Sequence, residues 1–300
     1  MIDVCLAGTG GMLPLPDRWL TCCWLEYNGK AALIDCGEGT QITLSKHGCK
    51  LSKLDALFIT HTHADHISGL PGLLLSVGNC GRTEPLTIYG FSGIGYVIDQ
   101  LSCICPVLPY RVEVRELSCT EISTLIWNGL EVRSLPLRHR MDCLGYSFTL
   151  RRKPVFNPQK AQNLGIPVQY WKQLHAGETL TLNGTEYTQD MVTDEARKPL
   201  KLTYMTDTVY FPEMIDFAKD SDLLVCEGMY GDDDYIPKML EKGHMVFSQA
   251  AELAKESGSS RLWLTHYSPA LSNPAEYTEM VQAIFPDTVV STDGQRMTLK

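Results

Sequence analysis

The feature that most constrains this chain is a block of metal-binding side chains directly after a run of apolar residues. Residues 56–60 read Ala-Leu-Phe-Ile-Thr, and residues 61–66 continue as His-Thr-His-Ala-Asp-His. Short apolar runs of this kind are typical of strands buried on both faces. The four side chains with metal-binding groups are His61, His63, Asp65 and His66. Imidazole nitrogens and carboxylate oxygens suit Zn²⁺, Fe or Mn, whereas soft-metal sites use thiolates.

A loop that leaves the end of a strand can turn its side chains in two directions. His61 and His63 can face one side while Asp65 and His66 face the other, so the block can serve two neighbouring metals. A solvated polar loop is a poor explanation for so many ligands in six residues.

The block alone cannot complete two sites, because each zinc needs about three protein ligands and an open position for water. Three further candidates each follow a predicted strand: His139 after residues 132–137, Asp207 after 202–206 and His266 after 263–265. A carboxylate at position 207 can bridge two metals. For any one of these residues alone, a structural or surface role is the simplest explanation. Because all three lie at strand ends, together they indicate a metal centre.

His244 is a candidate proton donor. It precedes a helix predicted over 248–257, and Glu227, at the end of the predicted strand 223–226, is a candidate to orient it. The alternative is a histidine at a helix entry without a catalytic role.

The periodicity predicts strands and helices through most of the chain. The expected strands are 31–35, 56–60, 112–117, 125–137 with a turn at Asn128-Gly129, 146–150, 201–206, 223–226 and 262–264. The expected helices are 39–46, 70–77, 248–257 ending before Gly258, and 274–284. Residues 151–200 are rich in Pro, Asn, Gln and Lys and have weak periodicity, which favours an inserted arm. We expect one layered α/β domain over residues 1–300, with the arm at about 151–200.

Composition narrows the class of protein without deciding the substrate. A net charge of −9 is not typical of a nucleic-acid binder, although the local charge around a site matters more. The eleven cysteines fit no zinc knuckle or redox pair, and we expect most to be buried, reduced thiols. The first residues lack the features of a signal peptide, and no apolar run is long enough to span a bilayer. We therefore expect a cytoplasmic protein with no membrane partner.

Beyond the ligands themselves, the motifs resemble those of the ribonuclease Z family of the metallo-β-lactamase superfamily, which trims the 3′ end of precursor tRNA. The resemblance covers nearly the whole chain and rests on these segments: 6–11, 33–41, 61–72, His139 with 144–146, 206–208, 226–228, His244 with Ala250-Ala251, and 264–266.

This resemblance implies a four-layer αββα sandwich, an endonuclease activity and a homodimer. It also implies that His61, His63 and His139 hold one zinc, that Asp65, His66 and His266 hold the other, and that Asp207 bridges them. Mn²⁺ or Fe are alternatives to zinc. By this resemblance a metal-bound hydroxide attacks the phosphodiester, Asp65 orients or deprotonates it, and His244, backed by Glu227, protonates the leaving 3′ oxygen.

The sequence departs from the family pattern where the substrate is bound. The Gly-Pro pairs of the family's tRNA-gripping arm are absent from residues 165–174. Val209-Tyr210 and 268–271 stand where the family has nearby arginines. Basic residues nevertheless bracket the arm, and four are candidate substrate contacts: Arg151, Arg152, Lys153 and Lys160. A solvated, charged linker explains them equally well.

The closest rival to a precursor-tRNA endonuclease is therefore a di-metal phosphodiesterase for a small substrate, such as a cyclic nucleotide or another phosphate ester. A non-catalytic binding protein on the same scaffold is the third hypothesis. It is weakened because all seven candidate ligands are present.

Overall fold

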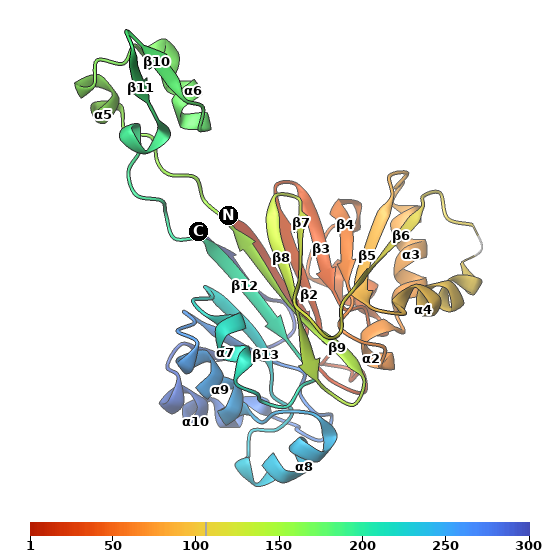
Figure 1. The fold of residues 1–300 in the computed structure, drawn as a ribbon. Helices are drawn as coiled ribbons and strands as arrows, with labels where there is room; N and C mark the ends of the chain where they lie inside the picture. The colour runs from red at the N-terminus through yellow and green to blue at the C-terminus, as the bar shows by residue number, and fades with distance from the viewer. Residues whose placement is uncertain (106) are drawn as a thin grey trace. The chain divides into compact units, whose positions relative to one another are not determined.

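Two seven-stranded sheets form the centre of the computed structural model, which describes residues 1–105 and 107–300 (Figure 1). The first sheet has the order β16 (Gln295–Leu299), β1 (Ile2–Gly8), β2 (Cys22–Tyr27), β3 (Lys30–Ile34), β4 (Leu54–Phe58), β5 (Leu86–Phe91) and β6 (Val112–Leu117). The second has the order β15 (Thr288–Val290), β14 (Leu262–Thr265), β13 (Leu223–Glu227), β12 (Leu200–Met205), β9 (Asp142–Leu150), β8 (Leu130–Arg138) and β7 (Ser123–Trp127).

The two sheets pack face to face through aromatic side chains. The ring of Phe58 on β4 lies 5.3 Å from that of Tyr146 and 5.0 Å from that of Phe148, both on β9. All three side chains are buried. Phe58 meets both rings edge-on, which is the arrangement that aromatic quadrupoles favour.

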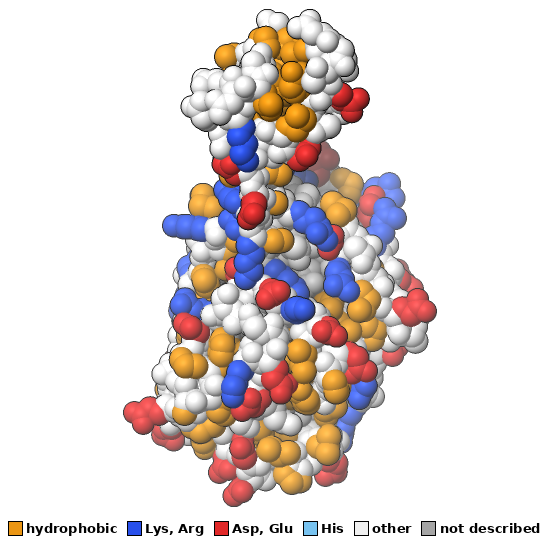
Figure 2. Space-filling view, turned by 60° about the vertical axis from the view of Figure 1, so that its left-hand side comes forward, with side chains coloured by type: hydrophobic (Ala, Val, Ile, Leu, Met, Phe, Trp, Pro, Cys, Tyr) orange, Lys and Arg blue, Asp and Glu red, His pale blue; other side chains and the backbone are white. Residues whose placement is uncertain are grey.

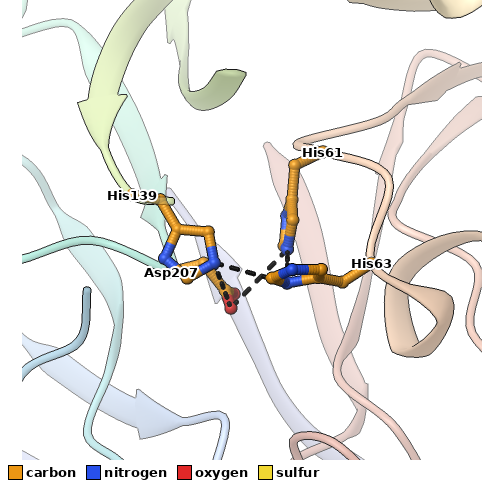
Figure 3. A group of neighbouring side chains, drawn as sticks. All are labelled: His61, His63, His139 and Asp207. Atoms are coloured by element: carbon orange, nitrogen blue, oxygen red, sulfur yellow. Dashed lines mark hydrogen bonds and ion pairs between the residues drawn. The ribbon is translucent and has the colours of Figure 1, made fainter. Parts of the chain in front are cut away.

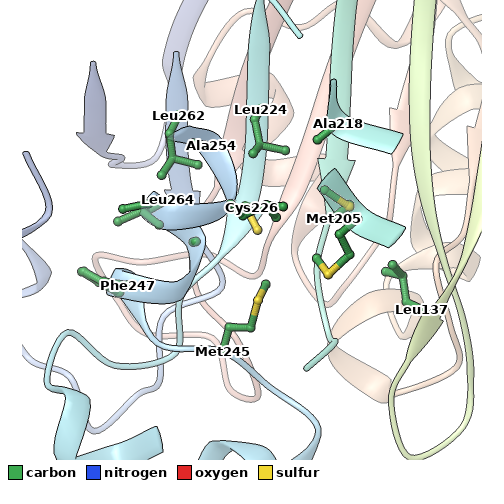
Figure 4. Close-up of a cluster of buried hydrophobic side chains, with 14 of the residues drawn as sticks. Leu137, Met205, Ala218, Leu224, Cys226, Met245, Phe247, Ala254, Leu262 and Leu264 are labelled. Carbon is green, nitrogen blue, oxygen red and sulfur yellow. The ribbon is translucent and has the colours of Figure 1, made fainter. Parts of the chain in front are cut away.

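Helices cover the outer faces of both sheets. Those beside the first sheet are α1 (Thr40–Lys46), α3 (Leu70–Asn79) and α4 (Ile94–Leu101), whereas the short helix α2 (Ala64–Ile67) lies in the connection after β4. Those beside the second are α7 (Glu213–Ala218), α9 (Phe247–Glu256) and α10 (Thr278–Ile284), whereas α8 (Ile236–Lys242) lies beyond the strand ends. Figure 4 shows side chains of α7 and α9 packed with those of β12, β13 and β14. The four-layer αββα prediction is therefore confirmed.

The structure also tests the predicted elements. The turn at Asn128-Gly129 joins β7 to β8, and both residues have positive φ, as a two-residue hairpin turn requires. The helix predicted from Ser248 forms as α9. One prediction was inaccurate: residues 274–277 form a 3₁₀ turn, and α10 begins only at Thr278. Proline at the start suits either kind of helix, so periodicity alone could not separate them.

Residues 150–199 form a compact unit of their own, distinct from residues 1–149 and 200–300. The unit contains α5 (Pro158–Asn163), α6 (Trp171–Ala176) and the hairpin of β10 (Leu180–Leu182) with β11 (Thr185–Tyr187). Its small core consists of Ala161, Ile166, Leu174, Leu180 and Val192. Figure 2 shows apolar side chains at the surface of this unit. Val168 is among the exposed ones.

All eleven cysteines are free thiols, and most are buried, as expected for small apolar side chains. Across the described residues, no helix is both long enough and apolar enough to span a membrane.

Candidate metal centre

The candidate ligands follow strands whose C-terminal ends lie at one edge of the two sheets. Strand β4 runs parallel to β3, and β12, β13 and β14 run parallel to one another. Parallel strands end at a common edge, where α/β proteins place their sites. The loop after β4 carries the block at 61–66, and His139, Asp207 and His266 follow β8, β12 and β14.

One group of side chains converges around His63 (Figure 3). Its Nδ1 lies 2.9 Å from His61 Nε2 and 3.3 Å from His139 Nε2. Asp207 Oδ1 completes the group, 3.7 Å from His61 Nε2 and 4.0 Å from His139 Nε2.

A second group forms beside it from Asp65, His66 and His266. The two imidazole Nε2 atoms lie 3.2 Å apart, and Asp65 Oδ2 lies 3.5 Å from the first and 3.4 Å from the second. Asp207 Oδ2 is 3.3 Å from both. The two oxygens of Asp207 thus face different groups.

Both groups fit a divalent cation of the zinc type. A tetrahedral ion with bonds of about 2.0–2.1 Å holds its ligand atoms roughly 3.3 Å apart, close to the spacing in the second group. The donors are all imidazole nitrogens and carboxylate oxygens, which repel one another at these distances unless a cation or protons lie between them.

The electrostatics of five of these side chains suit a cation, whereas at His66 the carboxylates of Asp207 and Asp35 outweigh burial and raise the pKa. Burial lowers the pKa of His61, His63 and His139, so their rings are neutral and offer lone pairs. Burial opposes the ionised form of Asp65 and Asp207, but the neighbouring histidines outweigh it and hold both pKa values below the usual range. Neutral imidazoles and ionised carboxylates are the forms that bind metal.

Asp35 orients two of the histidines from behind. It accepts hydrogen bonds from the Thr60 backbone N–H at 2.8 Å, from the Thr60 hydroxyl and from His66 Nδ1 at 2.8 Å. Because the Thr60 hydroxyl donates to Asp35, its oxygen can accept from His61 Nδ1 at 3.1 Å. Each ring is thereby held with Nε2 directed into the centre.

Three of the strand-end residues have a left-handed backbone. Asp35, Asp207 and His266 have φ of 61°, 58° and 61°. This conformation costs a non-glycine residue of order 1–3 kcal/mol. At each position it turns the chain sharply as it leaves the strand, and the side chain is buried in the centre.

Two glycines allow the loop of the 61–66 block to pack closely. A Cβ on Gly37 would lie 2.1 Å from the Asp65 carbonyl oxygen, and a Cβ on Gly69 would lie 2.0 Å from the Gly37 carbonyl oxygen. The Met12 backbone N–H also donates to Asp65 Oδ2 at 2.7 Å. The glycine contacts hold this loop on one side, and the hydrogen bond from Met12 holds it on another.

His244 lies at the same centre but has a different environment. Its Nδ1 is 3.0 Å from Glu227 Oε2, while Glu227 Oε1 accepts from the Thr208 N–H at 2.6 Å. Burial alone would lower the pKa of His244, but the Glu227 carboxylate outweighs it and raises the pKa to about 9. The imidazole is therefore protonated at neutral pH.

A cleft of about 360 Å³ opens over both groups. His244 and Asp65 line it, as do the cationic side chains of Arg140 and Lys242 and the ring of Tyr230. A cationic and partly aromatic wall suits a phosphate ester.

The four basic candidates for substrate binding belong to the unit of residues 150–199. Arg152 donates to the Lys198 carbonyl oxygen at 2.6 Å. Lys160 donates to the Thr193 carbonyl oxygen at 2.6 Å and pairs with Asp194 at 3.1 Å. Lys160 thus already has an anionic partner.

Sequence reasoning did not assign a role to several residues that hold the ligands. Asp35 had a usable signal, because it ends a predicted strand as the ligands do. Thr208, Met229 and the Gly243 carbonyl had none, because their contacts come from distant segments, and the role of Thr60 depends on its distant partner Asp35. The Gly243 carbonyl accepts from His139 Nδ1 at 2.9 Å.

Comparison with solved structures identifies the fold. The short form of human tRNase Z superposes with a TM-score of 0.71 at 24% identity, covering 99% of both chains. The metallo-β-lactamase fold protein YhfI of Bacillus subtilis has a TM-score of 0.70 at 19% identity, covering 99% of this chain and 98% of that one. The model of the β-lactamase superfamily domain matches residues 191–267, and that of the anti-Pycsar protein Apyc1 matches residues 2–89. The chain therefore has the metallo-β-lactamase fold.

Sequence comparison narrows this class to one family. The chain is 46% identical to ribonuclease Z of Lachnospira eligens over 100% of its length and 98% of that protein. It is 42% identical to ribonuclease Z of Lachnoclostridium phytofermentans, with the same coverage. The chain belongs to the ribonuclease Z family.

Proposed function

We propose that this protein is a two-zinc endonuclease that removes the 3′ trailer of precursor tRNA. The observation that carries the proposal is the pair of neighbouring ligand groups, which Asp207 joins. The chain also aligns from end to end with relatives named ribonuclease Z. Mn²⁺ or Fe would suit the same nitrogen and oxygen donors.

In this proposal His61, His63 and His139 would hold one ion, Asp65, His66 and His266 would hold the other, and Asp207 would contribute a carboxylate oxygen to each group. When bound, such a pair of ions lowers the pKa of a water towards neutrality and offsets the charge that develops on a phosphoryl oxygen. Asp65, fixed by the Met12 N–H, orients the attacking water and accepts its proton.

His244 supplies the second proton transfer. Its ring is protonated at neutral pH because Glu227 raises its pKa to about 9, and it lines the same cleft as the ligands. It donates a proton to the 3′ oxygen as the bond to phosphorus breaks, and Glu227 stabilises the charged ring before transfer.

Residues 1–300 then act as one catalytic domain with an inserted arm, and the arm grips the RNA. Arg151, Arg152 and Lys153 would contact phosphates near its base. We further propose a homodimer that works in the cytoplasm. Sedimentation of the purified protein tests the dimer: a sedimenting species of one chain would contradict it.

The assay for the proposed function uses two substrates. Zinc-loaded protein is incubated with a 3′-extended precursor tRNA and with bis(p-nitrophenyl) phosphate, beside the Asp65→Ala variant. We expect one cut just past the acceptor stem, and loss of both activities in the variant. Hydrolysis of the small diester without tRNA cleavage would contradict the proposal.

That outcome would instead support a phosphodiesterase for a small substrate. The observation that favours this second function is the set of departures around substrate binding, namely Val209-Tyr210, 268–271 and the missing Gly-Pro pairs at 165–174. Absence of both activities in the metal-loaded protein would favour a non-catalytic binding protein.

A further inference from the structure

The ring nitrogen of His266 that faces away from the ligand groups has an unusual partner. His266 Nε2 faces the second group, so when this nitrogen holds a cation the ring proton lies on Nδ1. Nδ1 is 3.2 Å from the sulfur of Met229. Both side chains are buried.

Three other histidines of the centre have oxygen partners at the equivalent position. His61 Nδ1 faces the Thr60 hydroxyl, His66 Nδ1 the Asp35 carboxylate and His139 Nδ1 the Gly243 carbonyl. An acceptor behind a metal-bound imidazole orients the ring and raises its donor strength. A thioether is a weaker acceptor than any of these oxygens.

Met229 is held firmly enough to orient the ring. Its backbone N–H donates to the Met245 carbonyl oxygen at 3.0 Å, and its own carbonyl oxygen accepts from the Ser268 N–H at 3.1 Å. Its side chain packs with Met239 and Val246 in a small buried cluster. The backbone of Met229 is therefore fixed by two loops, and its buried side chain has apolar neighbours beside His266.

We propose that Met229 is a positioning residue for His266, and that its sulfur makes the group of Asp65, His66 and His266 bind its cation less tightly than an oxygen acceptor would allow. This inference rests on the two-metal proposal above. It adds that the side chain behind His266 sets how tightly that group binds its cation.

Three variants of the full-length protein separate the possible roles of this side chain. Met229→Leu keeps the apolar volume and removes the acceptor. Met229→Asn places an oxygen at the same number of bonds from the backbone as the sulfur. Met239→Leu is the matched control, because Met239 is equally buried, lies in the same cluster and lines the same cleft.

Metal binding is measured on metal-free protein by competition for Zn²⁺ against a chromophoric chelator, and by ¹¹³Cd NMR of the cadmium-loaded protein. The resonance that His63→Ala abolishes is assigned to the group around His63. The other resonance reports on the group that contains His266.

We expect Met229→Leu to weaken binding at the His266 group by about threefold to tenfold, less than the 10–100-fold typical of stronger partners. Only the resonance of that group should shift. Met229→Asn should bind at least as tightly as the wild type, and Met239→Leu should match the wild type in affinity and spectrum.

Two results would overturn the inference while leaving the two-metal proposal intact. One is a Met229→Leu variant that binds both ions like the wild type. The other is an equal loss in Met229→Leu, Met229→Asn and Met239→Leu, which would mark a general effect of repacking. A wild-type protein with only one cadmium resonance would contradict the two-metal proposal itself, and this inference with it.

Discussion

At the scale of single residues, the centre depends on side chains that do not face the cation. Asp35 is fully buried, and its carboxylate accepts from Thr60 and His66. Burial raises the pKa of Asp35, although its hydrogen bonds oppose that effect. Burying an ionised carboxylate costs free energy unless hydrogen bonds and nearby positive charge compensate for the lost hydration.

The Asp35→Asn variant should bind metal about 10–100-fold less tightly. Asparagine tolerates the left-handed backbone at this position and preserves the volume, so folding should survive. However, the amide is a weaker acceptor for His66 Nδ1. Chelator competition measures the affinity, with the more exposed Asp55→Asn as the control. Unchanged affinity in Asp35→Asn would show that the carboxylate does not support the ligand.

The pair of His244 and Glu227 gives a prediction about pH. A proton donor works in its protonated form, so kcat for precursor tRNA should fall as the pH rises through about 9. Glu227→Gln removes the charge that raises the pKa of His244. The fall in kcat should therefore move to lower pH in this variant, with metal content unchanged.

The small diester supplies the control for this experiment. Its nitrophenolate leaving group needs no proton, so its hydrolysis should change far less than tRNA cleavage in Glu227→Gln. An equal loss on both substrates, or an unmoved pH profile, would argue against His244 as the proton donor.

At the scale of elements, the centre is built where strands end and loops cross closely. The loop after β4 carries four candidate ligands, and its position depends on the close approach of Gly37 and Gly69. A small shift of this loop moves both ligand groups together, because it contributes to each.

Gly69→Ala should therefore disturb the centre more than an ordinary loop substitution. The added Cβ would lie 2.0 Å from the Gly37 carbonyl oxygen, which is backbone and cannot move alone. We expect a loss of about 1–3 kcal/mol in the free energy of unfolding, together with weaker metal binding. Chemical denaturation and metal titration measure the two effects.

Gly72→Ala is the matched control for this substitution. Gly72 lies within α3, and its added Cβ would meet only the side-chain amide of Gln41, at 3.0 Å. Alanine also favours the helix. If Gly69→Ala is no more destabilised than Gly72→Ala, the close approach does not restrict the loop.

At the scale of the whole molecule, the chain has two compact units with separate hydrophobic cores. Residues 150–199 bury Ile166 and Leu174 among themselves, while all seven candidate ligands lie in the larger unit. The unit of residues 150–199 can therefore be removed without deleting any candidate ligand.

Replacing residues 151–199 by a short Gly-Ser linker should leave hydrolysis of bis(p-nitrophenyl) phosphate within about threefold of the wild type. Cleavage of precursor tRNA should fall at least tenfold, mainly through KM, since lost phosphate contacts weaken binding. Both rates are measured on the same preparation. Unaltered tRNA cleavage would contradict the role of the arm as a grip.

The amino-acid sequence by itself determined the layered α/β class, most strands of the second sheet and the candidate ligands. Those properties are local: a buried strand has its apolar run, and a ligand-bearing loop has its histidines within a few residues. The sequence did not predict β1, β2, β5 and β16 of the first sheet. The arm's core escaped prediction because its apolar residues are scattered among polar ones.

Only the tertiary structure decided which groups support the ligands. Asp35 and Thr60 are 25 positions apart, His139 and Gly243 are 104 apart, and His266 and Met229 are 37 apart. No local pattern encodes such pairs, because each arises from how two sheets bring their strand ends to one edge. Burial at that edge then lowers the local dielectric, so the strength of every supporting hydrogen bond depends on the folded chain.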